Sequence, residues 1–257
     1  MIFIGERINT GFADIKQAVQ QKDPKPLQEW ARKQTEAGAT YLDVNLGAVS
    51  SKAADLCWMI ESVQKAVETP ICIDSNKPKI LAEAIKACNK KALINSTTAA
   101  DDKLDQVLGI AVEHHASVIG VTMDETGTPK DANKRVENAG KILAKAMELG
   151  LPTEDVFLDP IVMPLKFSQE QARFILDAIK QFTLFCEPAP HIVCGLSNIS
   201  DGAVHKKVIN RTFLAMAIAN GLDAAICDVM DADLRNAALT ADLVLNKQIY
   251  ADLYIKK

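Results

Sequence analysis

Residues 92–122 read ALINSTTAADDKLDQVLGIAVEHHASVIGVT, and this stretch contains one complete strand–helix–strand repeat. The short apolar runs Ala92–Ile94 and Ser117–Thr122 do not alternate apolar and polar side chains, which is typical of strands buried on both faces of a parallel sheet. The segment between them carries apolar residues at the spacing of one helix face: Leu104, Val107, Leu108, Ala111 and Val112. The repeat therefore predicts two parallel strands joined by a helix.

The same alternation runs through the rest of the chain. Short apolar runs predict eight strands: Ile2–Ile4, Tyr41–Val44, Ile71–Ile73, Ala92–Ile94, Ser117–Thr122, Val156–Leu158, Ile192–Leu196 and Asp223–Cys227. Eight strands alternating with helices over 257 residues indicate an α/β protein with a closed (β/α)8 barrel, the TIM barrel. A doubly wound sheet normally has G-x-G-x-x-G after its first strand, and Gly5–Gly11 does not fit that spacing. No break in composition marks a second domain, so residues 1–257 are predicted to form one.

Composition excludes several classes of function. A net charge of −4 and a pI near 5.6 give no basic surface for nucleic acid or for an anionic membrane. No apolar run approaches the roughly 18 residues of a membrane span, and the first residues do not look like a signal peptide. The six cysteines form no C-x-x-C pair, which favours a reduced, cytoplasmic protein.

Polar residues lie at or just after the C-terminal ends of the predicted strands. The active site of a barrel lies at these strand ends. They are Asn9, Asp43, Asn45, Asp74, Ser75, Asn95, Ser96, Asp124, Asp159, Ser197, Asn198 and Asp228. Any one of them is commonly the N-cap of the next helix or a turn residue. Because eight loops converge on one mouth, we expect the set as a whole to line a binding site.

Several carboxylates at one mouth repel each other unless a cation or a donor-rich ligand lies among them. A metal site would call for histidines, and of the four in the chain only His205 falls in a loop on this side. A flat heterocycle such as a pterin offers a row of N–H donors along one edge, which carboxylates and amides can accept. Asp74, Asn95 and Asp159, from the third, fourth and sixth strands, are placed to share such a ring.

At these residues the sequence resembles a known family. The motifs that carry the resemblance are Gly5-Glu6-Arg7-Ile8-Asn9, Leu42-Asp43-Val44-Asn45, Asp74-Ser75, Ile94-Asn95-Ser96-Thr97, Leu158-Asp159-Pro160, Gly195-Leu196-Ser197-Asn198 and Ile209-Asn210-Arg211-Thr212-Phe213-Leu214. Together they resemble the methyltetrahydrofolate:corrinoid methyltransferases of one-carbon metabolism, which are pterin-binding barrels similar to the folate domain of cobalamin-dependent methionine synthase. The resemblance runs from Ile2 to about Tyr254, and it rests on the ordered set because each motif alone is weak.

The resemblance implies roles for individual residues. Asn198 matches the family's asparagine beside N5 of the folate, and Asp43 matches a position in the hydrogen-bond network around the pterin. Arg211 matches a motif arginine with no assigned contact, and a structural ion pair is its alternative role. The implied pterin-binding residues are Asp74, Asn95, Asp159, Asn198, Ser96, Glu6 and Asn9.

A catalytic role for Asn198 has a chemical reason. Transfer of the methyl group from N5 requires that N5 gain a proton, because its amide-like anion is a poor leaving group. The Asn198 side chain can accept a hydrogen bond from N5–H, and water or Asp43 can relay the proton. A charge-assisted bond of about 1–3 kcal/mol corresponds to roughly 10–100-fold in rate. Asn198 and Asp43 are therefore the candidate catalytic residues.

The predicted substrate is methyltetrahydrofolate or tetrahydrofolate, and no metal is predicted to be bound by this chain. A D-x-H-x-x-G cobalamin motif is missing, because His205 is followed by Lys206-Lys207-Val208. The resemblance therefore implies that the corrinoid, a cobalamin, arrives on a partner protein, and it also implies a homodimer. Tetrahydrofolate can be the acceptor, as in O-demethylation, or methyltetrahydrofolate the donor, as in acetyl-CoA or methionine synthesis.

Three other functions stay open at this point. A dihydropteroate synthase is also a pterin barrel, but the available lysines do not form its usual motifs. A non-catalytic folate-binding subunit of a corrinoid complex would have the same mouth without the transfer activity. A sugar-phosphate aldolase or isomerase would need a glycine-rich phosphate loop, which Cys227–Asp231 is not.

Overall fold

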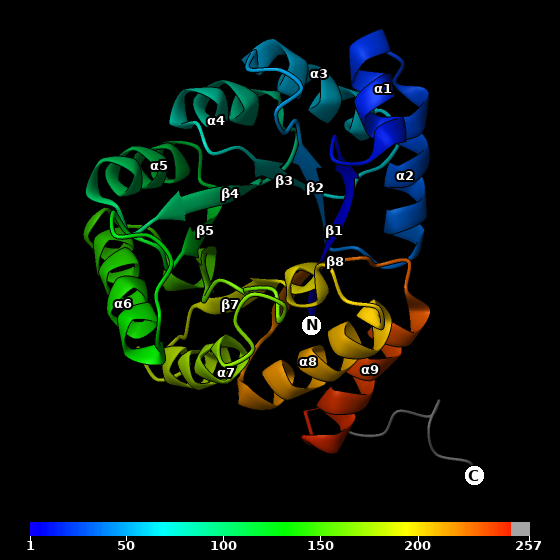
Figure 1. Ribbon diagram of the computed structural model, residues 1–257. Coiled ribbons are helices and arrows are strands. Elements are labelled where there is room, and N and C mark those ends of the chain that lie inside the picture. The colour runs from blue at the N-terminus through cyan, green and yellow to red at the C-terminus, as the bar shows by residue number, and fades with distance from the viewer. Residues whose placement is uncertain (248–257) are drawn as a thin grey trace.

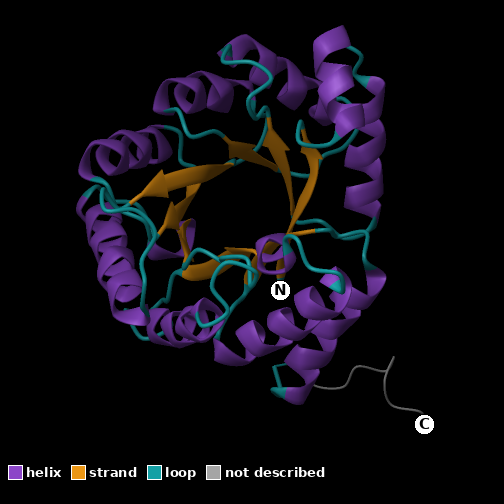
Figure 2. Ribbon diagram, viewed as in Figure 1, coloured by secondary structure: helices purple, strands orange, loops and turns teal. Residues whose placement is uncertain are grey.

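The computed structural model describes residues 1–247, which form a closed barrel of eight parallel strands in sequential order. The strands are β1 (Ile2–Asn9), β2 (Tyr41–Asn45), β3 (Ile71–Asp74), β4 (Leu93–Thr98), β5 (Ser117–Val121), β6 (Val156–Asp159), β7 (His191–Gly195) and β8 (Ala224–Cys227). β1 closes the ring by pairing with β8, from Ile2 opposite Ala224 to Gly5 opposite Cys227. Figure 1 shows the strands as an inner ring, and Figure 2 shows the helices around it.

The helices cover the outer face of this ring. They are α1 (Ala13–Gln21), α2 (Lys25–Glu36), α3 (Ala53–Gln64), α4 (Pro78–Ala84), α5 (Asp101–Glu113), α6 (Ala132–Glu148), α7 (Gln171–Phe182), α8 (Lys206–Asn220) and α9 (Ala232–Val244), with short 3-10 helices η1 (Ile85–Ala87), η2 (Thr153–Asp155) and η3 (Leu196–Ser200). α1 and α2 both lie between β1 and β2, so this connection has one helix more than the simple repeat. The predicted (β/α)8 barrel is confirmed. Residues 248–257 of the predicted domain lie outside the described residues.

All eight predicted strands exist, and their ends differ in ways that matter for the mouth. β1 continues to Asn9 because its pairing with β2 resumes after a register shift between Gly5 and Ile8. Asn95 and Ser96 lie inside β4, where the register with β5 shifts between Asn95 and Thr97. Leu196, expected at the end of the seventh strand, instead begins η3. At their C-terminal ends the strand predictions were therefore several residues too short for β1 and β4, one residue too short for β2, β3 and β6, and one residue too long for β5 and β7.

Two hydrophobic layers hold the barrel together. The larger lies between the strands and the surrounding helices. The smaller fills the inside of the barrel and consists of Ile4, Cys72, Leu93, Ile119, Phe157, Val193 and Ala224. Because side chains alternate along a strand, the residues two positions after Ile4, Cys72, Leu93 and Phe157 also face inward. Those residues are Glu6, Asp74, Asn95 and Asp159, so a polar layer lies directly above the apolar one.

Two further findings concern the predicted environment of the chain. Within residues 1–247, no helix is both long enough and apolar enough to cross a membrane. The six cysteines are all free thiols.

Candidate active site at the barrel mouth

Two hydrogen bonds connect acids and amides across the ends of β2, β3 and β4. The Asn95 side chain donates from Nδ2 to Oδ1 of Asp43 over 3.1 Å. Asn45 donates from Nδ2 to Oδ2 of Asp74 over 2.5 Å. Three of the predicted residues, Asp43, Asp74 and Asn95, are therefore brought together, although Asp43 and Asn95 lie 52 positions apart along the chain.

Burial governs the protonation of these acids. Desolvation raises the pKa of Asp43 well above its ordinary value, and the neighbouring Asp74 carboxylate raises it further. Desolvation also raises the pKa of Asp74, to about 6, while the Asn45 bond and the Lys103 ammonium act in the opposite direction. Two carboxyl groups this close together resist being ionised at once. A ligand with N–H donors would relieve that repulsion by binding to the ionised oxygens.

Asp159 ends β6 on another side of the mouth. Its Oδ1 accepts from the amide of Ile161 over 2.8 Å, and within residues 1–247 its other oxygen has no hydrogen-bond partner. Desolvation raises its pKa to about 6, against the lowering effects of the Ile161 amide and the Arg135 guanidinium. No hydrogen bond of the described residues links Asp159 to Asp43, Asp74 or Asn95. The inward position of Asp159, two residues after Phe157, is what relates it to them.

Asn198 and Glu6 lie on the β7–β8–β1 side. Ser197 donates to Oε1 of Glu6 over 2.7 Å, and desolvation raises the Glu6 pKa. Asn198 is exposed in η3 and folds back toward the end of β7. A Cβ on Gly195 would lie 2.8 Å from its Nδ2, so the space beside this amide requires glycine at 195.

Asn9 and Ser96 are placed differently from the others. Asn9 Oδ1 accepts from the Gly11 amide over 2.7 Å, so this oxygen stabilises the turn after β1. Ser96 follows Asn95 at the irregular part of β4, and its hydroxyl has no hydrogen-bond partner among the described residues. Neither residue belongs to the bonded acid–amide group.

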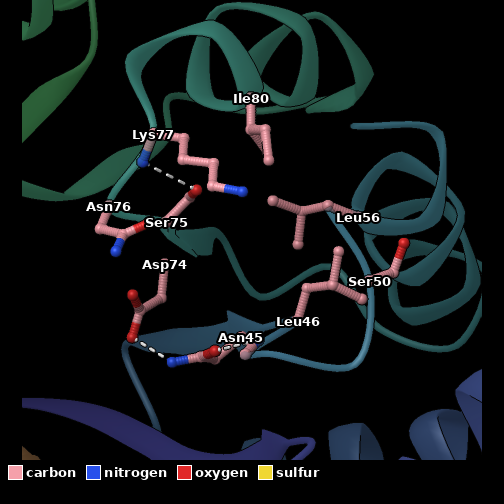
Figure 3. Close-up of a pocket in the computed structure, with 10 residues that line it drawn as sticks. Asn45, Leu46, Ser50, Leu56, Asp74, Ser75, Asn76, Lys77 and Ile80 are labelled. Atoms are coloured by element: carbon pink, nitrogen blue, oxygen red, sulfur yellow. Dashed lines mark hydrogen bonds between the residues drawn. The ribbon is translucent and has the colours of Figure 1, made fainter. Parts of the chain in front are cut away.

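A cavity of about 240 Å³ opens beside Asp74 and Asn45. Figure 3 shows Asp74 and Asn45 along one side and the side chains of Leu46, Leu56 and Ile80 along the apolar side. Lys77 extends its ammonium group into the same space (Figure 3). The mouth therefore continues from β2 and β3 outward toward α3 and α4.

Several residues that shape the site make contacts that the sequence does not reveal. Asn45 and Ser197 were visible as strand-end polar residues, but their partners Asp74 and Glu6 could not be read from spacing. Lys103 gave no signal because it lies on helix α5 among other polar residues, and its charge lowers the pKa of Asp74.

Other predicted features have structural roles. Arg211 pairs with Asp231 over 2.7 Å and with Asp233 over 3.0 Å, which is the ion pair given as its alternative role. His191 bonds Asp223 over 2.6 Å at the start of β7. Within residues 1–247, no group of three or more His, Cys, Asp and Glu side chains is arranged to hold a metal ion.

The motif around Glu6 is also largely structural. Gly5 faces Gln34, whose Oε1 would lie 2.4 Å from a Cβ at position 5. The Arg7 guanidinium lies 4.0 Å from the centre of the Phe12 ring and 4.2 Å from that of Trp30. Glu6 turns into the barrel, where its carboxylate accepts from Ser197.

Comparison with known proteins places this geometry in context. The profile described as "Pterin binding enzyme" matches residues 5–228. The methylcorrinoid:tetrahydrofolate methyltransferase of Eubacterium limosum is 33% identical over all of this chain and 95% of its own length. The methionine synthase of Mycobacterium tuberculosis is 27% identical over 88% of this chain, and the match covers 20% of that enzyme.

Solved structures agree on the fold. Dihydropteroate synthase from Thermus thermophilus superimposes with a TM-score of 0.68 at 18% identity, covering 96% of this chain and 94% of that one. The Yersinia pestis dihydropteroate synthase has the same TM-score at 15% identity, with the same coverage. At these identities the likeness is one of fold.

Proposed function

Because the chain belongs to the pterin-binding enzyme family, we propose that it transfers a methyl group between N5 of tetrahydrofolate and the cobalt of a corrinoid carried by a partner protein. The full-length similarity to the Eubacterium limosum methyltransferase supports this reaction. The observation that carries the proposal is the polar layer at the mouth, where Asp74, Asn95 and Asp159 face the barrel interior. Their oxygens are acceptors of the kind that the N–H edge of a pterin needs.

In this function Asp74 and Asp159 bind the pterin edge as carboxylates. Asn95 donates its amide hydrogen to Asp43, which leaves its carbonyl oxygen for a ring N–H. Ser96, Glu6 and Asn9 complete the proposed lining. Glu6, held by Ser197, limits the mouth on the β1 side.

Asn198 is proposed to contact N5, the nitrogen that exchanges the methyl group. Methylation of N5 requires that it lose a proton, and demethylation requires that it gain one. The amide of Asn198 can accept from N5–H in either direction, and Asp43 or water relays the proton. The raised pKa of Asp43 supports this role, because burial strengthens the hold of this carboxyl group on a proton and brings its pKa closer to the range in which a relay works.

The direction proposed is from methylcorrinoid to tetrahydrofolate. The name of the Eubacterium limosum relative puts the methylcorrinoid first, as donor. This direction suits the demethylation of a methylated substrate, such as O-demethylation. Purified protein, methylated cobalamin and tetrahydrofolate would then yield methyltetrahydrofolate, Co(I) cobalamin and a proton. Transfer that is efficient only from methyltetrahydrofolate to Co(I) cobalamin would reverse the assignment.

The test of the proposed catalytic residue is methyl transfer by Asn198→Ala at saturating folate. The loss of one charge-assisted hydrogen bond predicts a rate roughly 10–100-fold lower. Asn133→Ala is the matched control, because Asn133 is an exposed amide on α6 outside the barrel mouth. An unchanged rate for Asn198→Ala would remove this residue from the mechanism.

Two assays separate the function from its alternatives. A folate-binding subunit without activity would take up tetrahydrofolate and leave methylated cobalamin unchanged. A dihydropteroate synthase would condense hydroxymethylpterin diphosphate with aminobenzoate. We expect methyl transfer in the first assay and no condensation in the second.

A homodimer is proposed to form over α7 and α8. A groove between these helices is lined by apolar side chains including Leu176, Phe213 and Met216. Nearby, Val208 is 62% exposed and Met216 is 49% exposed. We expect Met216→Glu to produce a monomer in sedimentation, whereas Met147→Glu on α6, where the methionine is 53% exposed, keeps the dimer.

Residues 1–257 are proposed to be one domain, working in a reducing compartment such as the cytoplasm. The free state of the six cysteines supports the reducing compartment.

A further inference from the structure

The side chain that stands out beside the mouth is Arg135, which is completely buried on α6. Arginine is almost never fully buried unless a carboxylate pairs with it. Within residues 1–247, Arg135 has no salt bridge with any acid, and desolvation lowers its pKa. The burial of this guanidinium therefore needs an explanation other than an ion pair.

Its hydrogen bonds show what it holds. Nε donates to the carbonyl of Pro160 over 2.7 Å, Nη1 to the carbonyl of Asp131 over 2.9 Å, and Nη2 to Oε1 of Gln171 over 2.7 Å. Gln171 in turn donates to the carbonyl of Lys130 over 2.7 Å. Arg135 thus joins the start of α6, the start of α7 and the loop that follows β6.

That loop begins immediately after Asp159. Ile161 has φ of 63°, a left-handed conformation that a β-branched residue adopts only when its surroundings impose it. In this conformation the Ile161 amide donates to Oδ1 of Asp159 over 2.8 Å. The peptide carbonyl between Asp159 and Ile161, that of Pro160, is the one that Arg135 holds.

Asn138, one turn along α6, acts on the other side of Asp159. It is buried and donates to the carbonyl of Thr122 over 3.1 Å. The amide of Thr122 donates to the backbone carbonyl of Asp159 over 2.9 Å. Two buried polar side chains on one face of α6 therefore fix the backbone on both sides of this carboxylate.

We propose that Arg135 is the positioning residue of Asp159: it holds the Pro160 carbonyl so that the Ile161 amide stays on one carboxylate oxygen and the other is presented, ionised, to the pterin. This inference rests on the proposed function. The positive charge also stabilises the ionised carboxylate, in agreement with the lowering effect of Arg135 on the Asp159 pKa. Arg135 reaches the substrate only through Asp159.

The test compares Arg135→Gln and Arg135→Lys with wild type. Tetrahydrofolate binding is measured by calorimetry from pH 5 to 8, together with the KM and kcat of methyl transfer. We expect Arg135→Gln to weaken tetrahydrofolate binding at pH 7.5 by about tenfold or more, the order of one lost charge-assisted interaction, to raise KM in parallel and to change kcat little. The midpoint of the pH dependence, near the Asp159 pKa of about 6, should move upward because the stabilising charge is gone. Arg135→Lys keeps the positive charge but loses the three guanidinium nitrogens that make the hydrogen bonds. The pH midpoint of tetrahydrofolate binding should therefore stay the same while KM rises.

The matched control is Ile142→Val, another fully buried residue of α6, which packs on β5 at Gly120 rather than on the β6 loop. A purely structural role for Arg135 predicts that Arg135→Gln behaves like Ile142→Val. Both would lower the unfolding midpoint and the amount of active protein, and both would leave KM and the pH midpoint of tetrahydrofolate binding unchanged. That pattern in Arg135→Gln would overturn the proposal. In an Asp159→Asn background the extra loss from Arg135→Gln should disappear, and its persistence would also count against it.

If Arg135→Gln fails to fold, a second variant still tests the inference. Gln171→Ala leaves Arg135 in place but removes the acceptor of its Nη2 together with the bond to the Lys130 carbonyl. It should raise the tetrahydrofolate KM by roughly threefold or more, because Nη2 loses a charge-assisted hydrogen bond. An unchanged KM there also refutes the inference. The two proposals fail separately. If the wild-type protein neither binds tetrahydrofolate nor transfers a methyl group, the proposed function is refuted. If the wild-type protein is active but the Arg135 and Gln171 variants have an unchanged KM and pH midpoint, only the role of Arg135 is refuted.

Discussion

The amide of Asn95 donates to the carboxyl group of Asp43 over 3.1 Å, from β4 to β2 and past the intervening strand β3. This bond fixes the orientation of the Asn95 side chain, since its nitrogen faces Asp43 and its oxygen faces away. It also stabilises the ionised form of Asp43, against the larger effect of burial. In the proposed function the two residues have different roles: Asn95 offers its carbonyl oxygen to the pterin, and Asp43, whose pKa burial raises, relays the proton.

Asp43→Asn tests that division. The substitution keeps the size of the side chain and removes its titrating proton. We expect the methyl-transfer rate at saturating folate to fall by about tenfold or more, because the relay is lost. Calorimetry should find the tetrahydrofolate affinity nearly unchanged, and a large loss of affinity with an unchanged rate would show that Asp43 serves binding instead.

Asp159→Asn is expected to make the free protein more stable while weakening, but not abolishing, its affinity for tetrahydrofolate. The pKa of Asp159 in the folded protein is about 6 against an ordinary value of 3.8, so the folded state binds this proton more tightly than the unfolded state does. The ionised carboxylate therefore destabilises the fold above pH 6, by at most about 3 kcal/mol at roughly 1.36 kcal/mol per pKa unit. Asparagine keeps the oxygen that accepts from Ile161. Urea unfolding at pH 7 should show the gain, which shrinks as the pH falls from 6 toward 4, and a variant less stable than wild type at pH 7 would contradict it.

Affinity for tetrahydrofolate should fall on acidification. Asp74 and Asp159 both have a pKa of about 6, and only the ionised forms accept two N–H bonds from the pterin edge. Below pH 6 the dissociation constant should rise roughly tenfold per pH unit for each carboxylate that must ionise. Calorimetric titrations from pH 8 to 5 check the slope, with Asp159→Asn expected to have a shallower one. A flat profile would mean that neither acid binds the ligand in its charged form.

Gly195→Ala probes the place of Asn198 without changing Asn198 itself. The new methyl group would lie 2.8 Å from Nδ2 of Asn198 and would push the amide away from the end of β7. We expect a rate loss similar to that of Asn198→Ala, with tetrahydrofolate binding retained. The double variant should lose little more activity than either single variant, because both substitutions remove the same contact between Asn198 and N5. Fully additive losses would mean that Gly195 acts elsewhere.

Arg211→Gln is predicted to affect stability and leave catalysis unchanged. Arg211 bonds Asp231, which caps α9 by accepting from the amides of Asp233 and Leu234. Loss of the partly exposed ion pair should lower stability by about 1 kcal/mol or less. Thermal unfolding measures that decrease, and a raised tetrahydrofolate KM would show instead that this arginine reaches the substrate.

The fold could be predicted because each strand is a short apolar run and each helix has an amphipathic period. The inward direction of Asp74, Asn95 and Asp159 could be predicted too, since all three end such runs. The register shifts in β1 and β4 could not, because they depend on pairing with strands far along the chain, and they altered the surroundings of Asn9 and Ser96. Arg135 was missed for a different reason: it lies in a helix rich in polar residues, where sequence does not distinguish a solvent-exposed arginine from a buried one.

The bond from Ser197 to Glu6 joins residues 191 positions apart, and β1 finds its second neighbour only in β8. β1 is therefore synthesised long before β8, and one of its edges lacks its barrel neighbour until β8 has formed. The Glu6 side of the mouth can therefore form only after the segments around β7 and β8 are in place. Pairing of β1 with β8 is thus the step that completes both the barrel and its mouth.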